Sequence, residues 1–320
     1  MDKPTLISFV IPCYYSQDTI RKEVEAVIEQ FEMNEGYDYE FILVNDGSTD
    51  GTFDEIRYLC EKYPGGVKGI NLMRGFGQHN AQMAGLNYAT GKYIMGMDDD
   101  MQTHPSQVFK LIHKIEEGYD VVYGEYPKSK NGIFKQLSSR FNRFTSRVML
   151  DMPKEIIATN FWIITDKVRE QVVKYSSFNP VLDAIFYQVT HNFGKVDVEH
   201  HKRESGKSGY TFRKLVRLWL SYWNYSVVPL RISFFIGALA AFFGLIVTIW
   251  TIYKKITDPV LPMGWASTLC LTTLLFGAVL MVLGVVGEYL GKAILMLNKT
   301  PQYIVREELN TDNKNTDEKN

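Results

Sequence analysis

Three consecutive aspartates, Asp98, Asp99 and Asp100, stand at the end of a short apolar segment, residues 92–98. Adjacent carboxylates repel one another, so a chain tolerates such a cluster where a divalent cation neutralises it. If the segment is a strand, alternate side chains point the same way, which places Asp98 and Asp100 on one face and turns Asp99 aside. Mg²⁺ or Mn²⁺ held there would take its remaining ligands from phosphate oxygens. The cluster therefore predicts a metal that assists the departure of a diphosphate.

Two further polar clusters end apolar segments in the same way. Pro12, Cys13 and Tyr14 stand at the end of segment 5–12, and the polar segment 45–51 ends the next apolar run. Taken alone, segment 45–51 is explained equally well as a turn with a helix N-cap, and an aspartate triplet as a solvated loop. Three such clusters after three strands are harder to explain as ordinary loops, so together they predict a ligand site.

Apolar segments alternate with segments of helical period along the first 210 residues. The expected strands are 5–12, 39–48, 66–73, 92–98 and 119–125, and the expected helices include 18–31 and 104–118. This alternation predicts an α/β domain with a mostly parallel sheet that is covered by helices on both faces. In such sheets the ligand lies at the carboxyl ends of the strands, where the three polar clusters fall.

The composition changes after Arg231. Residues 232–253 and 259–287 carry no charged side chain, and a membrane-spanning helix needs roughly 20 apolar residues. Soluble helices show a polar face, so we expect a transmembrane hairpin with helices at about 232–253 and 264–287. Lys and Arg gather on both flanks of the hairpin. The positive-inside rule therefore predicts a multi-pass protein of the inner (cytoplasmic) membrane with its first domain in the cytoplasm.

The expected organisation has four parts. They are an α/β domain over 1–210, an amphipathic juxtamembrane helix over 211–231, two transmembrane helices within 232–290, and a cytoplasmic tail over 291–320. From Glu307 onward the tail is polar, and we expect its end to be disordered.

Composition also argues against other classes of protein. The formal net charge is −1, so bulk charge does not indicate a nucleic-acid partner. The three cysteines are scattered and odd in number, which is typical of neither a disulfide framework nor a cysteine metal site and fits a reducing compartment.

A basic amphipathic segment lies within the first domain, over residues 132–150. It carries Lys135, Arg140, Arg143 and Arg147, and the three arginines share one helical face opposite a row of apolar side chains. Such a segment is typical of a helix that lies on a membrane and gathers anionic lipid or lipid phosphate. An ordinary solvated helix face is the alternative.

Several motifs resemble a known family. Segments 10–20 (VIPCYYSQDTI), 43–52 (LVNDGSTDGT) and 97–105 (MDDDMQTHP) resemble the nucleotide-sugar motifs of glycosyltransferase family 2, whose members have the GT-A fold. Together with segments 200–220 and 284–305 and the two uncharged runs 232–253 and 259–287, these motifs resemble the polyprenyl-phosphate glycosyltransferases. That group includes GtrB-like and ArnC-like enzymes and dolichyl-phosphate mannose synthases. The resemblance covers all of the chain except the polar tail.

The resemblance implies roles for the matching residues. The nucleotide-sugar would be bound by Pro12, Tyr14, Asp46, Gly47, Asp98 and Asp99, with Asp46 accepting from the base. Mg²⁺ or Mn²⁺ would be held by Asp98, Asp100 and Gln102. The acceptor phosphate would be bound by Lys135, Arg140, Arg203, Ser208 and Tyr210. The resemblance also implies membrane lipid as a partner and a homo-oligomer, a tetramer formed through the membrane segments.

The implied activity is metal-dependent, inverting transfer of a sugar from a nucleotide-sugar to a polyprenyl phosphate, for modification of cell-envelope glycans. We expect a UDP-sugar and undecaprenyl phosphate. A phosphate monoester is largely a dianion at neutral pH, because its second pKa is about 6, so it can attack without a general base. A hydroxyl acceptor needs one. The alternative is therefore a membrane-tethered enzyme that extends a glycan with Asp183 as base, although Asp183 is equally well explained as a helix-start aspartate.

Overall fold

The computed structural model describes residues 3–101, 105–126, 157–178, 180–199, 264–297 and 301–311, together with the single helical positions Phe235, Leu239, Phe242, Ile246, Ile249, Trp250, Tyr253 and Thr257. Two compact units contain these residues. The described residues before position 200 and residues 301–311 belong to the first unit. Residues 264–297 belong to the second. The basic segment 132–150 and the expected juxtamembrane helix 211–231 lie outside the described residues.

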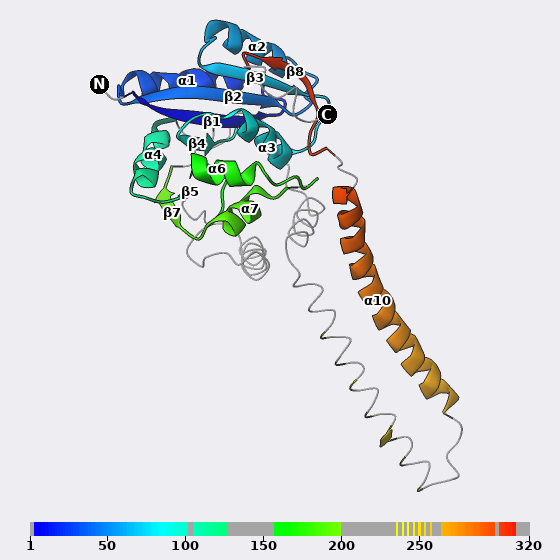
Figure 1. The fold of residues 1–320 in the computed structure, drawn as a ribbon. Coiled ribbons are helices and arrows are strands. Elements are labelled where there is room, and N and C mark those ends of the chain that lie inside the picture. The colour runs from blue at the N-terminus through cyan, green and yellow to red at the C-terminus, as the bar shows by residue number, and fades with distance from the viewer. Residues whose placement is uncertain are drawn as a thin grey trace. The chain divides into compact units, whose positions relative to one another are not determined.

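The described part of the first unit contains an eight-stranded sheet with the order β7-β5-β6-β4-β1-β2-β3-β8 (Figure 1). The strands are β1 (Thr5–Cys13), β2 (Tyr37–Asn45), β3 (Val67–Leu72), β4 (Tyr93–Gly96), β5 (Val121–Glu125), β6 (Trp162–Thr165), β7 (Phe193–Asp197) and β8 (Val305–Leu309). The pairs β1–β2, β1–β4, β2–β3 and β5–β7 are parallel, whereas β6 and β8 run antiparallel to their neighbours. The predicted α/β fold with a mostly parallel sheet is confirmed.

Helices cover both faces of the sheet (Figure 1). One face packs against α1 (Ile20–Glu32), α2 (Thr52–Lys62) and α4 (Val108–Glu116), and the last of these follows a short 3₁₀ helix, η1 (Pro105–Gln107). The other face carries α3 (Gln78–Tyr88), α6 (Asp166–Val172) and α7 (Leu182–Val189). Because the central strands are buried on both sides, their sequences are continuous apolar runs.

Helix α1 shows why these elements form where the sequence predicts them. Its buried side chains include Ile20, Val24, Val27, Ile28 and Phe31, the one apolar face expected for segment 18–31. They pack against alternate residues of β1 in a single hydrophobic core that also includes α2 and α4. Helix α3 approaches the opposite face closely at Gly85, where an added Cβ would lie 2.5 Å from Val10.

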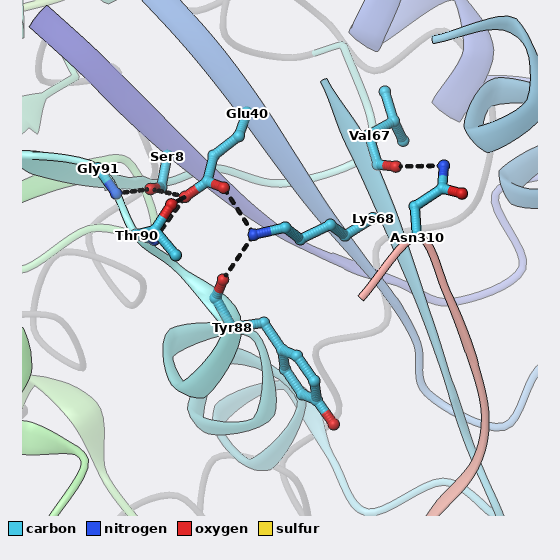
Figure 2. A network of polar contacts seen from close by, with 8 residues as sticks. All are labelled: Ser8, Glu40, Val67, Lys68, Tyr88, Thr90, Gly91 and Asn310. Atoms are coloured by element: carbon cyan, nitrogen blue, oxygen red, sulfur yellow. Dashed lines mark hydrogen bonds and ion pairs between the residues drawn. The ribbon is translucent and has the colours of Figure 1, made fainter. Parts of the chain in front are cut away.

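A buried polar network lies in the amino-terminal halves of strands β1, β2 and β3 (Figure 2). Glu40 of β2 is 6% exposed and accepts hydrogen bonds from the Ser8 hydroxyl and from the backbone N–H and hydroxyl of Thr90. It also forms an ion pair with Lys68 of β3 at 2.8 Å. Burial alone would raise the pKa of Glu40, but hydrogen bonds from Lys68, Ser8 and Thr90 outweigh burial and lower it. One carboxylate thus ties three strands to the segment that leads into β4.

The second unit contains a long helix, α10 (Trp265–Leu297). Apolar side chains are exposed along it at Phe276, Val279, Leu283, Val286, Leu290, Ile294 and Leu297. Within the described residues, no helix has the length and apolar character needed to cross a membrane. Most of the expected helix 232–253 lies outside the described residues, and the expected helix 264–287 overlaps α10.

Two described elements fall within the expected tail over 291–320, the end of α10 and strand β8. Residues up to Leu297 belong to α10, and Glu307 lies within β8 rather than in a polar tail. Side chains along β8 alternate between partly buried and exposed, which is the two-residue period of a strand. Residues beyond 311 lie outside the described part of the chain.

Candidate active site

The predicted donor-binding residues lie where the parallel strands β1, β2 and β4 end. Pro12 is a buried residue of β1, and Tyr14 follows that strand with 61% of its surface exposed. Asp46 follows β2, and its backbone N–H donates to the carbonyl of Cys13 at 2.9 Å. The carboxyl ends of neighbouring strands are therefore joined at the edge where α/β sheets bind ligands.

Asp46 is fixed by the loop between β3 and α3. Its Oδ1 accepts from the backbone N–H of Phe76 at 2.7 Å, and its Oδ2 accepts from that of Gly77 at 2.9 Å. Burial raises the pKa of Asp46, while the two N–H donors act in the opposite direction. Each oxygen keeps a second lone pair, so the carboxylate can still accept from a ligand.

Gly47 allows the chain to turn directly after Asp46. Its φ is +71°, in the left-handed region that favours glycine. A Cβ at this position would lie 2.3 Å from the backbone nitrogen of Gly75, so no other residue fits without displacing the β3–α3 loop. The glycine thus brings the loops after β2 and β3 together.

Asp98 is held by two neutral side-chain amides. Gln78, the first residue of α3, donates from Nε2 to Oδ1 at 2.7 Å, and Asn160 donates from Nδ2 to Oδ2 at 3.0 Å. These donors fix the orientation of the carboxylate without neutralising its charge. A ligand that brings positive charge would meet a preoriented group.

Asp99 points toward the loop after β1. Its Oδ2 accepts from the backbone N–H of Tyr14 at 3.0 Å, so it connects the triplet to that loop. Strand β4 ends at Gly96, and the alternation used to place Asp98 and Asp100 on one face therefore ends before the triplet. Met101 follows with φ +58°, a backbone conformation that non-glycine residues rarely adopt and that recurs at functional sites.

Negative charge accumulates around the triplet. Burial first, and then Asp100 and other acidic neighbours, raise the pKa of Glu23 to about 8, although the backbone N–H of Met101 opposes this. Burial likewise raises the pKa of Asp98 to about 6, with Asp100 adding to it and the Asn160 amide opposing it. Among the described residues, no group of three or more His, Cys, Asp or Glu side chains could hold a metal ion.

Asp183 belongs to a different cluster, in the first turn of α7. The Tyr123 hydroxyl donates to its Oδ1 at 2.9 Å. Burial raises the pKa of Asp183, whereas nearby His79 and the Tyr123 hydroxyl act against the shift. Burial lowers the pKa of His79, so the imidazole is biased toward its neutral form. The partners of Asp183 are therefore the Tyr123 hydroxyl and nearby His79.

The structure brings part of the predicted site together. Pro12, Tyr14, Asp46, Gly47, Asp98, Asp99 and Asp100 lie on the loops and strand ends of one sheet edge, and Asp183 lies on α7. Gln102, Lys135, Arg140, Arg203, Ser208 and Tyr210 lie outside the described residues.

Three residues at this edge are not predicted from the sequence: Gln78, Asn160 and Glu23. Gln78 and Asn160 reach Asp98 from segments 20 and 62 positions away, and no local pattern predicts either contact. Glu23 interrupts the apolar face of α1, between Ile20 and Val24, and this interruption was the one available signal.

The chain is similar to known glycosyltransferases. The model of the family described as glycosyl transferase family 2 matches residues 8–177. The uncharacterized glycosyltransferase YkcC of Bacillus subtilis (strain 168) is 29% identical over 317 residues, 98% of this chain and 97% of the relative. An undecaprenyl-phosphate 4-deoxy-4-formamido-L-arabinose transferase of Proteus mirabilis (strain HI4320) is 29% identical over 330 residues, 99% of this chain and 98% of the relative.

A solved structure shows the same fold. Glucosyl-3-phosphoglycerate synthase from Mycobacterium tuberculosis, in complex with Mn²⁺, uridine diphosphate and phosphoglyceric acid, aligns with a TM-score of 0.51 and 17% identity. The alignment covers 69% of this chain and 77% of that one. Since the family model matches more than half of the residues, this chain belongs to glycosyl transferase family 2 and is a glycosyltransferase with a GT-A-like α/β fold.

Proposed function

We propose that this glycosyltransferase moves a sugar from a nucleotide-sugar, with a UDP-sugar as the expected donor, to a polyprenyl phosphate, with undecaprenyl phosphate as the expected acceptor. The observation that carries the acceptor class is the extent of the similarity to the Proteus mirabilis transferase. It covers 99% of this chain, whereas the family model ends at residue 177. The similarity therefore includes the second unit and is not confined to the donor-binding domain.

The donor is assigned to the edge formed by the loops after β1, β2 and β3. Tyr14 is exposed there, and its ring packs edge-on against Tyr15 at 4.7 Å, which offers an aromatic surface to a base. The Asp46 carboxylate is fixed by two backbone N–H donors and can accept a further hydrogen bond from a base N–H. Pro12 and Gly47 shape the same edge.

Mg²⁺ or Mn²⁺ fits the aspartate triplet. The triplet is rich in hard oxygen donors. The pKa values of Asp98 and of nearby Glu23 are raised by burial and by acidic neighbours. Mg²⁺ is commonly bound by one or two carboxylates plus substrate phosphates, so Asp98 and Asp100 suffice without a third acidic ligand. Gln102 remains a proposed additional ligand. When bound, the ion would neutralise charge that develops on the departing diphosphate.

The chain's own residues then position the two reactants. Gln78 and Asn160 hold Asp98, and Asp99 holds the backbone of Tyr14, so the diphosphate and base regions share one rigid edge. We assign the acceptor phosphate to Lys135, Arg140, Arg203, Ser208 and Tyr210. Because that phosphate is already charged, in-line attack on the anomeric carbon inverts its configuration and requires no proton transfer to the protein.

We also propose that the protein is a multi-pass protein of the cytoplasmic membrane and that its first unit, which we call the catalytic unit, lies in the cytoplasm. Support comes from the charge-free runs 232–253 and 259–287 and from their basic flanks. The exposed apolar side chains along α10 fit contact with lipid tails. A homo-oligomer formed through these segments belongs to the same proposal.

Transfer of label tests the acceptor class. Membranes containing the chain would be incubated with radiolabelled UDP-sugars and then extracted with butanol. We expect label in the butanol-extractable lipid, released by mild acid, in membranes with the native chain and not with Asp98→Asn. Label that remains only in polymer would contradict the lipid-phosphate proposal and favour a hydroxyl acceptor, for which the raised pKa of Asp183 suits a general base.

A further inference from the structure

The segment after α10 returns to the catalytic unit and joins its sheet. Strand β8 pairs antiparallel with β3, next to it at the edge of the sheet (Figure 1). Asn310 fastens its far end, because Nδ2 donates to the carbonyls of Cys60 at 2.8 Å and Val67 at 2.9 Å (Figure 2 shows the second contact). The segment is thus held at the amino end of β3, and its other end lies near the carboxyl end, where the donor-binding loops begin.

A bulge directs one side chain of this segment onto the β3–α3 loop. The pairing passes from Asn71–Glu307 to Leu72–Val305, so Arg306 is the extra residue of the bulge. Bulges of this kind occur at sheet edges and next to active sites, where they redirect a side chain. The Arg306 guanidinium donates from Nη2 to the carbonyl of Met73 at 2.9 Å.

Met73 is held from both sides of its peptide unit. Its N–H donates to the carbonyl of Ile304 at 2.9 Å, in addition to the contact between its carbonyl and Arg306. The loop that Met73 opens ends at Phe76 and Gly77, whose N–H groups bind the Asp46 carboxylate. The C-terminal segment therefore fixes the first residue of the loop that fixes Asp46.

Gln302 connects the same segment to residues 175–178, which contact helix α3. Its Nε2 donates to the carbonyls of Ser177 at 2.8 Å and Tyr175 at 3.4 Å. The next carbonyl, that of Phe178, accepts from Asn80 of α3 at 3.4 Å. Helix α3 begins at Gln78, the residue that donates to Asp98.

We propose that residues 302–306 are a positioning element for the donor site, through Arg306 and Ile304 on the Asp46 side and through Gln302 on the Asp98 side. The inference rests on the proposed function for its ligand, a nucleoside diphosphate. It makes the donor edge depend on a segment that follows α10 in the chain, outside the residues that the family model matches.

Hydrogen exchange and nucleotide binding on the full-length chain test this proposal together. The test variants are Arg306→Ala and Gln302→Ala, and Arg306→Lys retains a cationic donor. The matched control is Glu307→Ala, which removes an ion pair of the same strand with Arg57 of α2, at 3.1 Å, away from the loop. The probes are amide exchange of the peptide that contains Phe76 and Gly77 and titration with UDP and GDP.

We expect exchange at Phe76 and Gly77 to rise about two- to tenfold in Arg306→Ala, the scale of one net hydrogen bond, with a matching loss of affinity for the nucleotide. Arg306→Lys should restore most of both, and Glu307→Ala should change neither. Unchanged exchange in Arg306→Ala, or an equal rise in Glu307→Ala, would overturn the positioning role. Faster exchange with unchanged nucleotide affinity would also overturn it. If the native chain binds neither nucleotide, the proposed function fails, while the exchange comparison still decides whether the segment fixes the loop.

Discussion

Glu40 and Asp98 are partly or fully buried carboxylates of the same sheet with opposite surroundings. Glu40, in the amino-terminal half of β2, meets the ammonium of Lys68 and several hydroxyl and backbone donors, and these contacts lower its pKa. Asp98, after the carboxyl end of β4, is held by two neutral amides beside acidic neighbours, and its pKa is raised to about 6, chiefly by burial. The charge of Glu40 is neutralised within the fold, whereas Asp98 is held in one orientation by groups that carry no charge.

This contrast separates a structural carboxylate from one that is available to a ligand. A group that the protein itself neutralises contributes to stability and has little left to offer a ligand. A group that is rigidly held but not neutralised costs stability in the free protein, and a positively charged ligand recovers that cost on binding. The two ends of the sheet should therefore respond to mutation in different assays.

Glu40→Ala should cause the largest effect, on stability alone. Removing the carboxylate leaves Lys68 without its buried partner, and breaking such a pair costs about 3–5 kcal/mol of the free energy of unfolding. Transfer activity per folded molecule should stay unchanged. Urea unfolding measures the first quantity and a transfer assay at low temperature the second. Glu117→Gln, at a surface ion pair with Lys114, is the control and should change neither.

Asp98→Asn should show the reverse pattern. It removes one charge from a repelling cluster, so the free energy of unfolding should change much less than in Glu40→Ala. Transfer, expressed as kcat/KM, should fall about 10²–10³-fold, the scale on which a preorganised electrostatic contact acts at a reacting centre. If Asp98→Asn destabilised the chain as strongly as Glu40→Ala, the proposed contrast between the two carboxylates would be wrong.

Asn160→Ala tests the orientation of Asp98 alone, because it removes an amide that holds Asp98 and leaves the carboxylate in place. Loss of a group that orients a metal ligand typically costs about 10–100-fold in metal affinity or activity. We expect more Mn²⁺ to be needed for half-maximal transfer, with most activity recovered at high Mn²⁺. Asn192→Ala, at the Gly118 carbonyl on another loop, is the matched control. A loss that excess Mn²⁺ does not relieve would argue against this role.

Asp183→Asn tests a third carboxylate. Burial raises its pKa, while nearby His79 and the Tyr123 hydroxyl oppose the shift. If the acceptor is a phosphate, the change should lower kcat by about tenfold or less, because no proton has to be removed. If Asp183 is a base for a hydroxyl, the loss should be roughly 10²–10⁴-fold. The pH profile separates the two, since a phosphate nucleophile loses activity below about pH 6 in both the native chain and Asp183→Asn.

The smallest effect concerns pH and stability at Glu40. The folded pKa lies below the ordinary value of 4.5, so the stabilisation is fully present above pH 4.5 and is lost as pH falls through the folded pKa. Urea unfolding at several pH values should show the native chain and Glu40→Gln converging below that point. A difference that widens on acidification would show that the pKa of Glu40 is raised instead.

The sequence predicts the central strands and the edge that carries the candidate site, for a physical reason. Strands β1 to β5 are buried on both faces or nearly so, and such strands leave continuous apolar runs. Strand β8 leaves no such signal, because VREEL places three consecutive charged residues between Val305 and Leu309. The amides of Gln78 and Asn160 escape for another reason, since they meet Asp98 only when distant segments are brought together by the fold.

Strand β8 also sets an order of events during protein synthesis. Asn310 bonds the carbonyl of Cys60, a partner 250 positions earlier in the chain. Ribosomes add roughly 5–20 residues per second, so this contact waits about 10–50 seconds after Cys60 has been added. During that interval the outer edge of β3 has no strand to pair with, and such an open edge invites association with other chains. The nascent enzyme should therefore depend on chaperones most strongly just before β8 leaves the ribosome.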